Sequence, residues 1–367
     1  MSSPVETQPA PLFGFRPLVK QLTEKPPILL GLILAILPLV YLVSYGRASA
    51  AGVVFLSSML LLVITMSGGL KVGLVNAPAF SILMTMSCIV GGRPLAAGAL
   101  ALIVALWASL GTASGRGALV IMGALIMTIQ IMTPPQVAHT TSPHAWRNVT
   151  AVFAYAVVAS AWGILIGVLL RRGRTIPSFP KVTLRWGITQ GLMIGVVVAI
   201  VAIVATSRHA GQGGAWLLMT TFLVFKPLTP DPWQHSLQRA LGTVLGVLIV
   251  AIYLHTLPAA APPMALLIPA ALMAVAAALT VLSQRWPYWC FVALWTPAVV
   301  LLFTCTSSAS KTVATARSVD VLRLEYSLLG IAIALAAEGL FLGINAAFHL
   351  EKNTWIGNAA RADPGGS

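Results

Sequence analysis

Charged residues are scarce in this sequence. Asp, Glu, Lys and Arg make up 8% of the 367 residues, whereas hydrophobic residues make up 58%. Because a soluble domain carries roughly a quarter charged residues, this composition excludes a water-soluble protein. The 22 basic residues outnumber the 8 acidic ones, but they lie between apolar runs and form no block. This distribution is typical of a polytopic membrane protein that is oriented by its basic loops, and nucleic acid is not expected as a partner.

Cysteine is also rare, and Cys88, Cys290 and Cys305 all lie within apolar segments. No CxxC pair and no histidine at ligand spacing accompanies them, so we expect packing thiols, no metal site and no cofactor. The sequence lacks a GxxxxGK[ST] phosphate loop, which argues against a nucleotide-driven pump. Residues 1–27 lack the apolar core and cleavage site of a signal peptide and are expected to form a cytoplasmic lead-in.

Apolar runs of about 20 residues, long enough to cross a bilayer as a helix, recur along the chain. About twelve can be placed, which predicts an all-α fold with about twelve transmembrane helices. The predicted spans are 28–46, 51–68, 74–90, 94–112, 117–133, 148–170, 186–206, 213–227, 239–257, 263–283, 287–305 and 324–346.

Loop charges predict the orientation of these spans. With the N-terminus in the cytoplasm, most of the 22 basic residues fall in cytoplasmic loops, as expected for a bacterial inner-membrane protein with both termini inside. The longest cytoplasmic segment, 171–185, separates a six-helix half, 28–170, from a second six-helix half, 186–346, and 347–367 forms a cytoplasmic tail. An even number of helices per half gives both halves one orientation, which predicts a parallel repeat.

Matching residues in the sixth and twelfth spans support this repeat. The pairs Arg147 and Arg323, Gly163 and Gly339, and Gly167 and Gly343 share one spacing of 176 residues (323 − 147, 339 − 163 and 343 − 167).

The segment around Arg239 carries the most specific pattern. Residues 216–254 read WLLMTTFLVFKPLTPDPWQHSLQRALGTVLGVLIVAIYL, a Trp-led span, a Pro-rich turn and then Arg-x-x-Gly-Thr-x-x-Gly, formed by Arg239, Gly242, Thr243 and Gly246. With the later run YWCFVALWTPAVVLLFT, this segment resembles the fusaric acid resistance family, which includes the aromatic acid exporters. The resemblance implies a secondary transporter that exports small anionic or aromatic carboxylic compounds beside a periplasmic adaptor protein.

The resemblance covers the second half by its motifs and the first half by its hydropathy pattern. The wider group includes plant aluminium-activated malate transporters, whose six-helix chains pair into dimers that two fused halves would imitate. Longer members carry a sizeable soluble domain between the membrane halves, whereas about fifteen residues separate the halves here. Any role of that domain therefore does not carry over.

Glu338 is the clearest candidate for energy coupling, because it lies inside the apolar run LGIAIALAAEGLFLG. A charge within the hydrocarbon is costly, so burial favours the protonated carboxyl that a proton-coupling residue requires. The alternative is an acid that pairs with an arginine of a neighbouring helix or reaches water at the interface.

Three arginines are candidates for the substrate pathway. Arg147 and Arg323 begin the sixth and twelfth spans on the outer side, where paired positive charge would attract carboxylates, and Arg239 begins the ninth span on the cytoplasmic side. The alternatives are headgroup anchoring for Arg147 and Arg239, and an ion pair of Arg323 with Asp320 or Glu325.

Other candidates concern packing and the wall of a cavity. Gly242 and Gly246 form a GxxxG pattern, which predicts close approach of a second helix. Among the tryptophans of the second half, Trp295 is the one predicted deep enough to line a cavity for an aromatic solute, while the others are expected at interfaces. The neighbouring Thr296-Pro297 pair predicts a discontinuous eleventh helix.

Two other functions remain open alternatives. An integral membrane enzyme acting on a lipid-linked substrate would need convergent catalytic groups, and His139 and His144 form a weak pair with no carboxylate nearby. We therefore expect no enzyme. A twelve-helix facilitator of another family fits the architecture, but the segment SGGLKVGLVNAP lacks the acidic and doubly basic pattern expected there.

Overall fold

In the computed structural model of the protein, the regular secondary structure is helical throughout the part that the structure describes, namely residues 26–113, 128–138, 142–171, 184–224, 232–258, 262–283, 286–306, 323–337 and 339–340. The helices are α2 (Pro26–Ser44), α3 (Ala48–Gly68), α4 (Leu70–Val90), α5 (Pro94–Ala113), α7 (Trp146–Arg171), α8 (Leu184–Ser207), α9 (Gly211–Val224), α10 (Pro232–Thr256), α11 (Pro263–Ser283) and α12 (Tyr288–Thr306). Residues 128–132 and 323–337 are also helical. Apolar runs fold this way because a helix satisfies its own backbone N–H and C=O groups where lipid offers no partner.

Each of the twelve predicted spans contains helical residues, so the predicted all-α polytopic fold is confirmed at this level. Two details of the prediction are wrong. Helix α10 begins at Pro232 and not at residue 239, and α12 continues through Pro297 as one helix. Proline is tolerated in the first turn of a helix, where its missing N–H has no intrahelical partner.

Some of the predicted segments lie outside the described residues. These are nearly all of the N-terminal lead-in, most of the linker at 171–185, the C-terminal tail and Glu338.

Five helical segments of the described residues are long and apolar enough to cross a membrane. They are Ser49–Met66, Leu70–Val90, Pro94–Gly111, Trp146–Arg171 and Ser236–Thr256, and shorter apolar helices lie at Gly191–Ser207, Met264–Ala277 and Tyr288–Leu302. The protein is therefore a multi-pass membrane protein.

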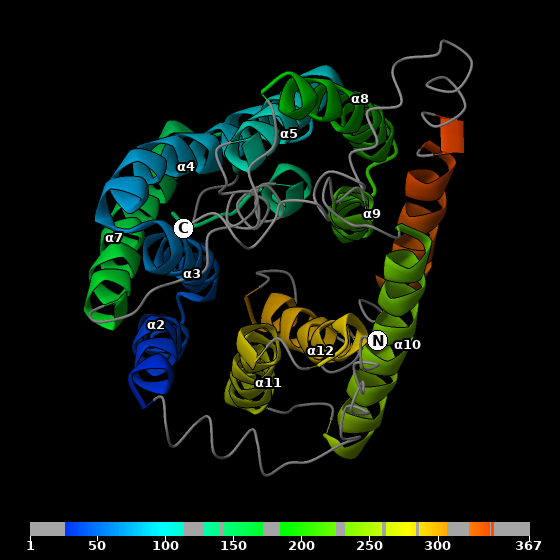
Figure 1. Ribbon diagram of the computed structural model, residues 1–367. Coiled ribbons are helices and arrows are strands. Elements are labelled where there is room, and N and C mark those ends of the chain that lie inside the picture. The colour runs from blue at the N-terminus through cyan, green and yellow to red at the C-terminus, as the bar shows by residue number, and fades with distance from the viewer. Residues whose placement is uncertain are drawn as a thin grey trace, which may run out of the picture.

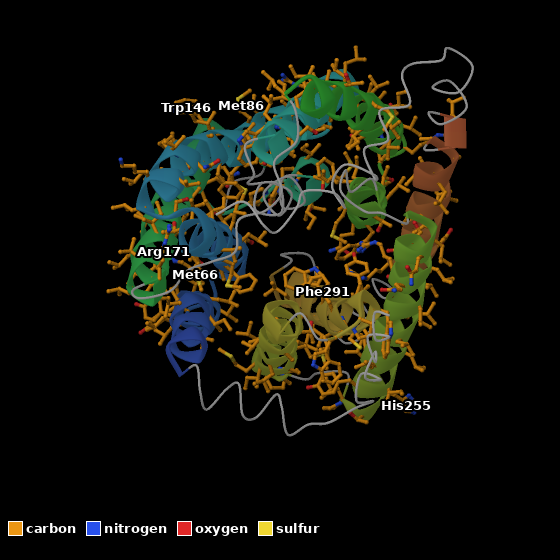
Figure 2. All side chains as sticks on the ribbon, in the orientation of Figure 1. Met66, Met86, Trp146, Arg171, His255 and Phe291 are labelled. Carbon is orange, nitrogen blue, oxygen red and sulfur yellow. The ribbon has the colours of Figure 1, made fainter. Side chains whose placement is uncertain are left out.

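Helix α7 packs along α3 in the first half of the chain. It runs from Trp146, near Met86 of α4, to Arg171, near Met66 of α3 (Figure 2). Gly163 lies against the backbone of Ser58 in α3. In contrast, a side chain at Gly339 would meet no described residue within 4 Å. Within the described residues, these two glycines, which the sequence pairs by spacing, therefore do not have equivalent surroundings.

The two halves meet chiefly where α5 packs against α8 (Figure 1). Three glycines allow this approach, because a Cβ atom at Gly98 would lie 2.6 Å from Ile203, one at Gly191 2.8 Å from Ser109 and one at Gly195 2.5 Å from Leu102. Helix α12 also contacts α3, and α11 contacts α2. Small residues at such contacts are the usual means of helix association in lipid.

Asn148 in the first turn of α7 fixes the non-helical stretch 133–138. Its Oδ1 accepts hydrogen bonds from the N–H groups of Val137 and Ala138, at 2.6 and 3.1 Å, and its Nδ2 donates to the carbonyls of Pro135 and Pro143, both at 2.9 Å. This fully buried side chain thereby provides hydrogen-bond partners for four backbone groups that lie outside the helices.

Candidate functional site

Arg239 lies about two turns inside α10, because that helix begins at Pro232. The side chain is 2% exposed, so it is not an anchor at the headgroups as the sequence allowed. Its Nη1 donates to the hydroxyl of Tyr288 at 3.2 Å and its Nη2 to that of Thr220 at 3.3 Å, and its Nε has no hydrogen-bond partner among the described residues. The guanidinium thus faces hydroxyl groups.

Arg323 opens the helix at 323–337 and is 1% exposed. Its Nη2 donates to the Thr296 hydroxyl at 3.1 Å, and its Cζ lies 4.2 Å from the centroid of the Trp216 ring. This is the geometry of a cation–π contact. Of the two acids that the sequence offered as ion-pair partners, Glu325 is exposed and Asp320 lies outside the described residues.

Helix α9 brings these two arginines together. It has 14 residues, about 21 Å of helix, and residues 213–222 are all buried. The guanidinium of Arg323 lies over the Trp216 ring. One turn further along α9, the Thr220 hydroxyl accepts a hydrogen bond from Arg239. The same hydroxyl lies 3.4 Å from the Ser327 hydroxyl. Arg239 and Arg323 are the two buried charged side chains of the described part, and both are cations.

The sequence did not reveal the role of α9. It placed Trp216 among the tryptophans at the membrane interfaces, whereas this side chain is fully buried. The hydroxyls of Thr220, Thr296 and Ser327 were missed, since threonine and serine are common in membrane helices. The one signal that could have found them is the spacing of Trp216 and Thr220, which places both on one face of α9.

Gly242 and Gly246 hold α12 close to α10. A Cβ atom at Gly242 would lie 2.6 Å from the carbonyl oxygen of Trp289, and one at Gly246 would lie 2.5 Å from Cβ of Thr296. The structure thus places the backbone and a small side chain of α12 against both glycines. This approach brings Thr296 to Arg323, and Tyr288 of the same helix to Arg239.

Trp295 lies on a different side of α12. Its ring stacks on Phe291, with centroids 5.9 Å apart, and Phe291 points toward the middle of the bundle in Figure 2. Trp295 borders a narrow apolar crevice whose other lining residues come from α2, α3, α11 and α12 (Leu39, Phe55, Ala270, Ala271, Ala274, Ala298, Val299 and Leu302). Neither arginine lines this crevice, so Trp295 and the arginines do not form one site.

Arg147 does not accompany Arg323. It is exposed at the start of α7, beside the exposed Trp146, whereas Arg323 is buried. The two arginines therefore do not flank one axis in equivalent positions, as their spacing in the sequence predicted.

A comparison with known protein families finds a match in the second half of the chain. Residues 198–337 match the model of the family described as fusaric acid resistance protein-like. This part of the chain is similar to that family. No curated protein and no solved structure matches the chain.

The fusaric acid resistance protein-like segment contains α9 to α12, both buried arginines and their hydroxyl partners, and it ends one residue before Glu338. The resemblance drawn from the sequence is thereby confirmed. The match supports a membrane transporter of small compounds.

His139 and His144 were the candidate catalytic pair for an enzyme, and the structure describes one of the two. His144 lies 2.6 Å through Nδ1 from the carbonyl oxygen of Cys88, near the end of α4, and His139 lies outside the described residues. Within the described chain, no three His, Cys, Asp or Glu side chains gather in a way that could hold a metal ion.

Proposed function

We propose that this protein is a secondary transporter that exports small carboxylate-bearing compounds, aromatic acids among them, across the bacterial inner membrane. The observation that carries this proposal is the pair of buried arginines that face hydroxyls and an aromatic ring (Arg239 and Arg323). Ionisable side chains buried inside a membrane protein are costly and mark functional sites by default, so the burial of both guanidinium groups favours a function.

The chemistry of the site suits a carboxylate. A guanidinium presents a fixed fork of N–H donors that matches the two oxygens of a carboxylate, and it stays charged at every physiological pH. Threonine and tyrosine hydroxyls can rotate and donate to the anion once an arginine turns toward it. Arg239 provides the guanidinium, and its hydrogen-bond partners Thr220 and Tyr288 provide the hydroxyl groups.

Transport by purified protein in proteoliposomes tests this proposal. We expect saturable movement of benzoate and none of benzamide, which has the same ring without the charge. Equal transport of both compounds, or of neither benzoate nor aliphatic carboxylates, would contradict a carboxylate transporter.

Glu338 is proposed as the proton-coupling residue, on the sequence alone. Glu338→Gln removes the titrating carboxyl and keeps the shape of the side chain, so we expect insertion to be retained while proton-driven efflux is lost. Efflux driven by an imposed pH gradient measures this, and exchange of labelled for unlabelled solute at equal pH serves as the control. Unchanged gradient-driven efflux would remove Glu338 from the mechanism.

We also propose that the two six-helix halves form a parallel repeat. Reciprocal contacts support this proposal, because α5 of the first half packs against α8 while α11 of the second half packs against α2. Likewise α12 contacts α3, and Met132 of the fifth span lies against Gly214 in α9. The fourth helix of each half thus contacts the first helix of the other half, and the fifth helix of each half contacts the second helix of the other. Cytoplasmic termini and a periplasmic adaptor stay predictions of the sequence.

A further inference from the structure

Two helices of the second half present polar side chains at the same spacing. Trp216 and Thr220 lie one turn apart on α9, and Arg323 and Ser327 lie one turn apart on the helix at 323–337. The rows face each other, since Arg323 covers the Trp216 ring and Thr220 lies 3.4 Å from Ser327.

A glycine keeps these rows in contact. A Cβ atom at Gly330 would lie 3.0 Å from the carbonyl oxygen of Leu217 and 3.0 Å from Cβ of Thr220. The two helices therefore approach closely at the point where the hydroxyls meet, and the polar groups form two layers that are about one turn apart on these two helices.

The first layer consists of Arg323, Trp216 and Thr296. The cation lies against a ring face, and its Nη2 is held by the hydroxyl of α12. Ring face and guanidinium together suit a solute that carries an aromatic ring and a carboxylate, because the ring can stack while the anion meets the N–H donors.

The second layer consists of Arg239, Tyr288 and Thr220. It belongs to different helices, since Arg239 comes from α10 and Tyr288 from the first turn of α12. Thr220 connects the layers, because its hydroxyl accepts from Arg239 and lies within hydrogen-bond distance of Ser327, one turn from Arg323.

We propose that the two layers are two successive anion-binding sites, so that a substrate carboxylate passes between Arg323 and Arg239 inside the second half of the chain. This proposal rests on the proposed carboxylate transport. It places the path within one half, because the buried polar side chains in the described part of the first half are all uncharged. The path then does not follow the contact between the halves.

Two neighbouring sites have a mechanistic consequence. Two anions held at adjacent sites repel each other, so occupation of the second site weakens binding at the first and promotes release. The hydroxyl pair of Thr220 and Ser327 supplies polar contacts to an anion in transit.

Equilibrium dialysis of radiolabelled benzoate against the full chain in nanodiscs tests the arrangement. We expect two bound benzoates per chain, one in Arg239→Gln and one in Arg323→Gln, and none when both are replaced. Arg147→Gln, which alters an exposed arginine, is the matched control and should retain two.

If an arginine variant does not fold, substitutions of the neighbouring aromatic residues can still distinguish two sites from one. Tyr288→Phe removes only the hydroxyl, and Trp216→Phe keeps an aromatic ring of smaller area. Each is expected to weaken one of the two sites by about fivefold without weakening the other. A single site that both substitutions weaken would show one anion clamped by both arginines, which would overturn the two-site proposal and leave carboxylate transport standing. Absence of saturable binding to the unaltered protein would overturn the proposed function itself.

Discussion

Replacing Arg239 by leucine is expected to reduce carboxylate export by about 100-fold or more while the protein remains folded. The variant removes a charged donor to the substrate, and hydrogen bonds to charged groups contribute about 1.5–3 kcal/mol each. It also removes a buried cation, and relief of the desolvation cost of that cation offsets the loss of the contacts to Tyr288 and Thr220. Thermal stability in detergent is therefore expected to be unchanged or raised. Initial export rates in proteoliposomes and a melting curve measure the two effects.

Arg208→Leu provides the matched control, since it makes the same change at an exposed position just after α8. It should leave both export and stability close to those of the unaltered protein. A variant at Arg239 that exports normally, or that unfolds because a structural contact is lost, would show that the buried guanidinium supports packing and does not bind substrate.

Replacing Gly242 by leucine is expected to give the largest loss of folded protein. The new Cβ would lie 2.6 Å from both the Trp289 carbonyl oxygen and the Val292 Cβ, so α10 and α12 must separate. Overpacking of this kind costs about 1–3 kcal/mol and occasionally more. Separation also moves Tyr288 and Thr296 away from their arginines, so export should fall with stability. Size-exclusion profiles and melting midpoints of the purified variant measure the effect.

Gly339→Leu is the control for this substitution. Gly339 is exposed, and a side chain there would meet nothing within 4 Å. We expect a normal elution profile for this variant. If Gly242→Leu were equally stable, the close contact of α10 with α12 would not contribute to the fold.

Hydropathy predicted the helices well because a helix that crosses the bilayer must be both long enough and apolar enough to span its hydrocarbon core. The predicted span 263–283 coincides with α11, and 94–112 ends one residue before α5 does. The start of α10 was missed because its first turns contain Gln234, His235 and Gln238, polar residues that are helical but do not raise hydropathy. A hydropathy scale therefore finds the lipid-crossing part of a helix and not its polar extension.

Because charged residues are scarce, the sequence singled out both arginines as candidates. It did not predict that their side chains lie close to the same helix. Arg239 and Arg323 are predicted at the starts of two different helices on opposite sides of the membrane, whereas α9 joins them through Trp216 and Thr220. That contact depends on how four helices pack, which periodicity does not encode. Spacing alone also suggested an equivalent role for Arg147, which the packing places at the surface.

The burial of α9 bears on how the chain is made. The side chains of α9 at 213–222 are covered by other helices in the finished protein. Arg323 and Ser327 leave the ribosome about a hundred residues after Trp216 and Thr220. A chain synthesised only as far as residue 322 therefore contains Arg239, which bonds Thr220, but lacks the arginine that covers the Trp216 ring.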